Sequence, residues 1–157
     1  MDLAPERQAR RRKGGKTAFD ADLADLFERP VSVERPGTHR IPFVFSSPHS
    51  GRCYPEGFVS TSNLDPVTLR RSEDSFVEEI FGGVKGLGAP LIHARFPRAY
   101  LDVNREPYEL DPTMFDGRLP PFANTAAVRV AGGLGTVPRL VGENMDIYRG
   151  KLCVEEA

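Results

Sequence analysis

Apolar residues recur along this chain with two spacings, one typical of helices and one typical of strands. The helical spacing predicts a first helix over 17–29, which Pro30 ends. It predicts a second helix over 72–84, with Ser72 as its N-cap and with Glu78 and Glu79 turned away from an apolar face. The apolar members of that face are Phe76, Val77, Ile80, Phe81 and Val84.

Short apolar runs between these segments predict strands. Ile41–Phe45 is continuously apolar, as in strands that are buried on both faces of a parallel sheet, and Leu91–Ala94 is the strand expected after the second helix. Alternation at Tyr100–Asn104 and a short run at Ala127–Val130 predict two more strands. Four prolines and a glycine predict a long ordered loop over 106–121. A strand, a helix and a strand in succession indicate a βαβ crossover, so we expect an α/β fold.

Composition narrows the class of protein. The 157 residues carry 21 Lys and Arg against 22 Asp and Glu, a net charge of −1 that implies no nucleic-acid partner. No apolar run approaches the roughly 20 residues that cross a bilayer, so no membrane span is expected. Two cysteines, Cys53 and Cys153, are too few for a disulfide framework and favour a reducing, cytoplasmic setting.

Charge is concentrated at the start of the chain. Residues 1–16 contain six basic and two acidic side chains and no apolar core of a secretory signal. Clusters of like charge usually stay solvated, so we interpret 1–16 as a basic disordered arm in front of one domain over 17–157.

Two polar residues lie where a ligand could bind. His49 follows the first predicted strand in Pro48-His49-Ser50-Gly51, and the carboxyl ends of strands are where open α/β sheets bind ligands. It is either a metal ligand or a loop histidine bound to backbone. Asp74, near the start of the second helix, leans toward its apolar face, although Asp74 and Glu73 would equally stabilise the helix dipole there.

Three arginines and an asparagine surround the predicted strand at 100–104. Arg95, Arg98, Asn104 and Arg105 could bind a carboxylate, because the guanidinium fork matches two carboxylate oxygens. They could equally form ion pairs with the nearby acids, which are Asp102, Glu106, Glu109 and Asp111. The glycine-rich turn at 132–136 lacks the Lys-Ser/Thr element of a phosphate loop, and no Gly-x-Ser-x-Gly motif marks a serine hydrolase.

Taken together, these segments resemble the N-formylglutamate amidohydrolases, zinc-dependent hydrolases distantly similar to carboxypeptidases and aspartoacylases. The resemblance runs from about residue 40 to the last residue, and its most specific part is 94–107. The matching segments are Pro48-His49-Ser50-Gly51 with Tyr54-Pro55, Glu73-Asp74-Ser75-Phe76-Val77 with Ile80-Phe81, Ala94-Arg95-Phe96-Pro97-Arg98-Ala99-Tyr100-Leu101-Asp102-Val103-Asn104-Arg105-Glu106-Pro107, Gly133-Leu134-Gly135-Thr136-Val137-Pro138-Arg139 and Ile147-Tyr148.

The resemblance implies roles for the candidate residues. His49 becomes a zinc ligand and Asp74 a second one, with Glu73 as the competing choice. Asn104 and Arg105 look like the pair that holds a substrate carboxylate in related enzymes, while Arg95 and Arg98 either assist or brace the site. The implied substrate is N-formyl-L-glutamate, cleaved to formate and glutamate in histidine breakdown, and the alternatives are another N-acyl amino acid or an inactive carboxylate-binding fragment.

The resemblance also implies a three-layer fold with a mixed, largely parallel sheet of the phosphorylase/hydrolase type. The family supplies a later zinc-binding histidine and a catalytic glutamate from a following half. Neither His39 nor His93 matches that histidine, so no catalytic base is assigned in this chain. We therefore expect the N-terminal portion of an amidohydrolase domain, truncated at its C-terminus, whose exposed sheet edge would favour association.

Overall fold

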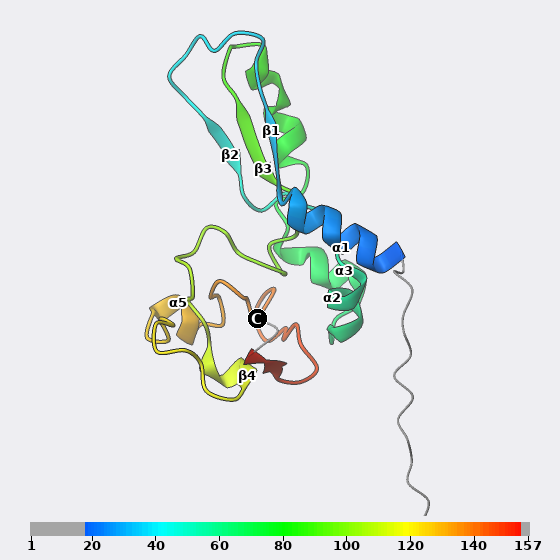
Figure 1. The fold of residues 1–157 in the computed structure, drawn as a ribbon, viewed down its shortest axis with the longest axis vertical. Helices are drawn as coiled ribbons and strands as arrows, with labels where there is room; N and C mark the ends of the chain where they lie inside the picture. Colours follow the sequence, from blue (N-terminus) through cyan, green and yellow to red (C-terminus); the bar gives the residue numbers. More distant parts are fainter. Residues whose placement is uncertain (1–17, 155–157) are drawn as a thin grey trace, which may run out of the picture.

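The structure is a computed structural model that describes residues 18–154, so the basic segment 1–16 lies outside the described residues (Figure 1). None of the described helices is long and apolar enough to cross a membrane. In chain order the elements are α1 (Ala18–Glu28), β1 (Val31–Glu34), β2 (Phe45–Ser47), α2 (Glu56–Thr61), α3 (Pro66–Leu69), η1 (Arg70–Ser72), α4 (Val77–Ile80), η2 (Phe81–Lys85), β3 (Leu91–Ala94), η3 (Pro112–Met114), β4 (Phe115–Asp116), α5 (Val128–Ala131) and β5 (Leu152–Cys153).

The larger sheet has the strand order β1-β3-β2, with β1 antiparallel and β2 parallel to the central β3 (Figure 1). The α/β class and the crossover between β2 and β3 are therefore confirmed. The sheet is mixed, and its largely parallel character is not confirmed. A second, two-stranded sheet pairs β4 with β5 in parallel.

Only one face of the three-stranded sheet is covered along its length by described helices. On that face Leu91 is buried with Val84 and Ala89, and the ring of Phe45 lies 6.0 Å from the ring of Phe81 in η2. On the opposite face Val33 of β1 remains 44% exposed. That face is covered at one end only, where Leu26 of α1 packs on Ala94, so the expected third layer is not confirmed in the described residues.

The expectation of a strand at Ile41–Phe45 buried on both faces is wrong. The strand β2 begins at Phe45, and Phe43 and Val44 before it are 62% and 65% exposed. The run is apolar, but it leads into an edge strand with a single covered face. Burial therefore reaches only Phe45 and Ile41, which pack on Val84 and its neighbours.

The continuous helix expected over 72–84 is also wrong. Phe76 adopts a left-handed conformation with φ of 65°, which interrupts the helix and leaves only the short α4 and η2 after it. Ser72 closes η1 instead of capping a helix. Glu78, expected in solvent, is buried, because Arg52 donates a hydrogen bond of 2.6 Å to its carboxylate.

Two other predicted strands are absent from the described residues. Tyr100 donates its N–H to the Pro97 carbonyl, so 97–101 turns instead of extending. Residues 127–130 enter the helix α5. By contrast, α1 matches the predicted 17–29 closely, β3 matches Leu91–Ala94 residue for residue, and 106–121 is irregular apart from η3 and β4.

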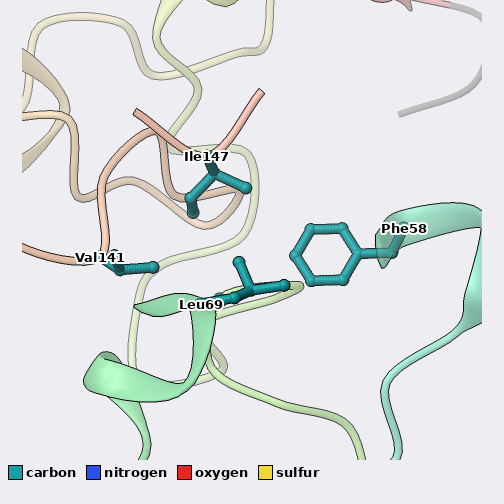
Figure 2. Packing of buried hydrophobic residues seen from close by; sticks show 5 residues of the cluster. Phe58, Leu69, Val141 and Ile147 are labelled. Atoms are coloured by element: carbon teal, nitrogen blue, oxygen red, sulfur yellow. The ribbon is translucent and has the colours of Figure 1, made fainter. Parts of the chain in front are cut away.

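One core joins the early helices to the last segments of the chain. Leu69 and Ile147 are fully buried, and they pack with Phe58 and Val141 (Figure 2). The contact holds α2 and α3 against 141–147, and Val141 also lines the cleft described in the next section.

Candidate active site

The turn after β2 fixes His49 against the end of β3. The Ser47 hydroxyl donates to the Ser50 hydroxyl over 2.8 Å, and His49 itself is 6% exposed. A Cβ at Gly51 would lie 2.1 Å from the Phe96 carbonyl oxygen, so only glycine lets this turn approach the segment after β3. Close backbone packing therefore explains the glycine of Pro-His-Ser-Gly.

The buried imidazole of His49 binds the buried carboxylate of Asp102. His49 Nε2 lies 2.8 Å from Asp102 Oδ1, and Asp102 is 1% exposed. The backbone N–H of Asn104 also donates to Oδ1, while Nε of Arg98 donates to Oδ2 over 3.0 Å. Nη2 of Arg105 lies 3.3 Å from Oδ2. Asp102 thus joins the candidate metal ligand to two of the candidate substrate-binding arginines.

Asp102 is ionised at neutral pH. Burial alone would raise the pKa of its carboxyl group, but the hydrogen bonds from His49 and from the Asn104 backbone, with the charge of Arg98, outweigh burial and lower the pKa to about 2. An ionised Asp102 accepts the Nε2 proton of His49. In the neutral tautomer that carries its proton on Nε2, the lone pair lies on Nδ1, which can then bind a metal.

Asp74 faces that nitrogen. Its Oδ2 lies 3.4 Å from His49 Nδ1, its side chain is 51% exposed, and its backbone N–H donates to the His49 carbonyl over 3.0 Å. Two ligands about 2.1 Å from a tetrahedral zinc ion are about 3.4 Å apart. The separation of the imidazole nitrogen and the carboxylate oxygen is that of two neighbouring ligands of a zinc ion, and the metal role of these two residues stays a prediction.

Glu73 is the competing candidate for the second metal ligand, but its carboxylate accepts hydrogen bonds from other side chains. Its side chain is fully buried, Arg70 donates two hydrogen bonds of 3.0 Å to it, and Tyr54 and Ser75 donate one each. Burial would raise the pKa of Glu73, but these donors lower it. Glu73 therefore holds the turn that presents Asp74, and the geometry favours Asp74 as the ligand.

The arginines expected to bind substrate differ in how many of their guanidinium nitrogens remain free to contact a ligand. Arg105 is 8% exposed in its side chain, and it donates to the carbonyls of Leu134 and Asn104 besides contacting Asp102. Among the described residues Arg98 contacts Asp102 through Nε alone, and it lines a cleft beside that residue. The geometry thus favours Arg98 for contact with a ligand and a supporting position for Arg105, while the side chain of Asn104 is exposed nearby.

Arg95 is directed away from this cleft. It donates to the carboxylate of Asp25 over 2.6 Å and to the carbonyl of Arg29 over 2.9 Å, so it fastens α1 and the residue after it to the end of β3. The alternative that Arg95 braces the domain accounts for these contacts.

A cleft of about 460 Å³ lies over Asp74, Arg98 and Asp102. Its wall also includes Ser72, whose hydroxyl has no hydrogen-bond partner among residues 18–154, and an apolar side made by Leu134 and its neighbours. The remaining lining residues are Arg71, Glu73, Gly132, Pro138, Leu140, Val141, Gly142 and Glu143. Within residues 18–154 no group of three or more His, Cys, Asp or Glu side chains is arranged to hold a metal ion.

The glycine-rich turn at 132–136 contacts the backbone of Asp102 and Glu109. The Thr136 carbonyl accepts from the Asp102 backbone N–H over 2.8 Å, and a Cβ at Gly135 would lie 2.2 Å from the Glu109 carbonyl oxygen. This turn contacts the backbone at 102 and 109 and the guanidinium of Arg105.

A sequence profile of the N-formylglutamate amidohydrolase family matches residues 41–157. The chain belongs to this family. The match covers His49, Asp74, Arg98 and Asp102 in one segment, and the resemblance seen in the sequence is confirmed.

A solved structure agrees with this membership. N-formylglutamate amidohydrolase from Ralstonia eutropha JMP134 is 33% identical, with a TM-score of 0.72 over 81% of this chain. The match covers 44% of the Ralstonia chain, so this chain spans less than half of that enzyme's length. Among curated proteins no relative matches.

The sequence did not single out Asp102 as the centre of the site. The sequence predicts Asp102 only as an ion-pair partner of arginines, which it is for Arg98 and Arg105. The signal was present, because Asp102 is one acid among three arginines and two residues before Asn104. Its bond to His49 joins residues 53 positions apart, which local spacing does not reveal.

Proposed function

We propose that this chain provides part of the active site of an enzyme that hydrolyses the amide bond of N-formyl-L-glutamate, releasing formate and L-glutamate, as in histidine breakdown. The observation that carries the proposal is the buried His49–Asp102 pair, which meets Asp74 and Arg98 at one cleft in a chain of this family. The two cysteines are exposed and unpaired, which suits the proposed cytoplasmic location.

His49 Nδ1 and Asp74 Oδ2 would hold a zinc ion, which when bound lowers the pKa of a water ligand and polarises an amide carbonyl. In this assignment Asp102 accepts the His49 proton at Nε2, which leaves Nδ1 available for the metal. Asp74, being half exposed, sits between the buried histidine and the cleft. The proposed metal position is therefore at the wall of the cleft, where a substrate can reach it.

Arg98 would bind a carboxylate of the substrate. Its guanidinium is held at Nε by Asp102, which leaves the two Nη atoms for an anion in the cleft. Leu134 and Leu140 offer apolar contact to the methylene groups of a glutamate side chain. Fixing one end of the substrate in this way holds the formyl carbon near the metal position, and Arg105 keeps Asp102 in place.

Substrate binding tests this assignment. We expect the chain to bind N-formyl-L-glutamate at least tenfold more tightly than the neutral diamide of the same compound in calorimetry, since a charge-assisted hydrogen bond contributes about 1.5–3 kcal/mol. Arg98→Gln should reduce that preference, whereas Arg118→Gln, at an exposed loop position, should keep it. An unchanged preference in Arg98→Gln would contradict the role given to Arg98.

Zinc affinity, measured by competition with a chromophoric chelator, tests the ligand pair. His49→Ala and Asp74→Asn should each weaken zinc binding at least tenfold, and His39→Ala, an exposed histidine outside the cleft, should not. Equal affinity in His49→Ala and wild type would remove His49 from the site.

A panel of N-acyl amino acids separates the remaining alternatives. Tighter binding of an N-acetyl or longer acyl compound would assign a different substrate. Binding of formylglutamate without turnover, even when the chain is fused to the unmatched part of the Ralstonia enzyme, would assign an inactive carboxylate-binding fragment.

A further inference from the structure

Arg52 joins the two turns that carry the candidate zinc ligands. It lies three residues after His49, and its Nη2 donates hydrogen bonds of 2.6 Å to Glu78 and 2.8 Å to Glu79. Both acids belong to α4, which begins three residues after Asp74. A side chain from the His49 turn therefore holds the helix that follows Asp74.

Phe76 lies between Asp74 and that helix in a left-handed conformation, with φ of 65°. Bulky residues rarely adopt this conformation, and they keep it only where the surrounding contacts impose it. The guanidinium carbon of Arg52 lies 5.1 Å from the centre of the Phe76 ring, within the range of a cation–π contact. The same guanidinium thus contacts both the left-handed residue and the helix after it.

The ion pair with Glu78 is the contact most sensitive to the loss of Arg52. Glu78 is 8% exposed, and its second oxygen, Oε2, is buried with no hydrogen-bond partner among residues 18–154. Without Arg52 this carboxylate would be buried and unpaired, which strongly disfavours the present arrangement. The pair with Glu79, which is 59% exposed, is of the weaker surface kind. We therefore expect the start of α4 to move when Arg52 loses its charge.

Asp74 is held on its other side from the same segment. The Tyr54 hydroxyl donates to the carboxylate of Glu73 over 3.0 Å. Asp74 itself is joined to the turn by its backbone N–H, which donates to the His49 carbonyl over 3.0 Å. Tyr54 thus holds the residue before Asp74, and Arg52 holds the residues after it.

We propose that Arg52 is a positioning residue, which fixes Asp74 beside His49 before a metal binds. It acts through Phe76 and Glu78. Two ligands that are already in place bind a metal more tightly, because little ordering is left to occur on binding. The inference rests on the proposed function for its use of zinc, whereas the hold of Arg52 on Asp74 is measurable without metal.

Arg52→Gln in the full chain tests the proposal with two measurements. Zinc affinity in chelator competition should fall at least about tenfold, as when other residues that orient metal ligands are replaced. In metal-free protein, NMR should show the Asp74 N–H exchanging with deuterium at least about tenfold faster, because its bond to the His49 carbonyl opens more often. The Leu69 N–H, inside the core, reports global unfolding and should be accelerated less than the Asp74 N–H.

Arg139→Gln is the matched control. Arg139 also pairs with two carboxylates, that of Asp111 at 3.1 Å and that of Asp146 at 2.8 Å. Its side chain is 33% exposed, against 37% for Arg52, and it does not line the cleft. The control should keep the zinc affinity and the Asp74 exchange rate of the wild type. An equal loss in this variant would overturn the proposal, because the effect would then follow from ion-pair loss in general.

Arg52→Lys is the second variant, for the case in which Arg52→Gln does not fold. It keeps a positive charge beside Glu78, but an ammonium group cannot bind two carboxylates and stack on a ring as the guanidinium does. Both changes should appear in the same direction and be smaller than in Arg52→Gln.

The His49→Ala variant separates failure of this inference from failure of the proposed function. Where His49→Ala weakens zinc binding, unchanged zinc affinity in a folded Arg52 variant would overturn the positioning role and leave the proposed function standing. Where His49→Ala binds zinc as the wild type does, the zinc site fails and the exchange rate decides. An unchanged rate at Asp74 would then overturn the positioning role, and a faster one would support it.

Discussion

Replacing Asp102 by Asn tests the centre of the site most directly. The substitution keeps the shape of the side chain and one accepting oxygen but removes the charge shared by His49, Arg98 and Arg105. Both guanidinium groups then face a neutral amide. Removing one partner from a buried ionic network is among the more costly changes in a folded protein.

The size of the effect follows from the pKa. A carboxyl group whose pKa falls from 3.8 to about 2 on folding adds about 2.4 kcal/mol to the free energy of unfolding at pH 7. Because the folded pKa is the lower one, this contribution is complete well above the unfolded pKa and is lost as the pH falls toward the folded pKa. From pH 5 to pH 3 it declines by about 1 kcal/mol.

Urea unfolding followed by circular dichroism at several pH values measures this contribution. Asp102→Asn should lower the free energy of unfolding by at least about 2 kcal/mol at pH 7, and the gap between variant and wild type should narrow by about 1 kcal/mol between pH 5 and pH 3. Asp116→Asn, an exposed carboxyl on β4, serves as the control and should show no such narrowing. A gap that stays constant with pH would refute the ionised, hydrogen-bonded Asp102.

Three further predictions come from single contacts. Gly51→Ala should lower stability by about 3 kcal/mol or more in thermal melts, because its Cβ would meet a carbonyl oxygen, while Gly37→Ala, with open space around it, should be nearly neutral. Leu69→Ala should cost about 2–5 kcal/mol in urea unfolding, since this side chain is fully buried, and a cost below about 1 kcal/mol would contradict the packing in Figure 2. Tyr54→Phe removes one hydrogen bond to Glu73 and should cost about 1 kcal/mol, and an unchanged urea midpoint would show that the bond contributes nothing.

The local sequence pattern predicts correctly those elements whose packing neighbours lie among the described residues. The strand Leu91–Ala94 has neighbours on both sides and a helix over one face, and its apolar run gave the correct bounds. The first helix ends shortly before Pro30, and Arg95 binds its C-terminal end. Its predicted range differs from the observed range by one residue at each end.

The failures have identifiable physical causes. Phe43 and Val44 look like interior strand residues, but the face and edge they approach are open in the described residues. At 76 a left-handed backbone breaks the helix that apolar periodicity favours, and the Arg52 guanidinium brings Glu78 inward. The spacing of apolar residues reveals neither the backbone conformation of a single residue nor an ion pair between residues far apart in the sequence.

The site was predicted in part by the residues and in greater part by the family resemblance. His49 and Asp74 lie together as expected, and their metal role stays a prediction. The different contacts of the three arginines could not be predicted. Arg95, Arg98 and Arg105 have the same side chain, and the sequence does not show which groups surround each one. Only the fold decides that one fastens α1, one lines the cleft and one is enclosed by carbonyls.

The proton between His49 and Asp102 offers a spectroscopic reporter. It lies between two buried groups, one of them ionised, so its exchange with water should be slow enough for its resonance to appear downfield of the backbone amides. Such a signal would be visible before any substrate or metal is added. Its shift on addition of zinc would report changes at the candidate site from a single atom.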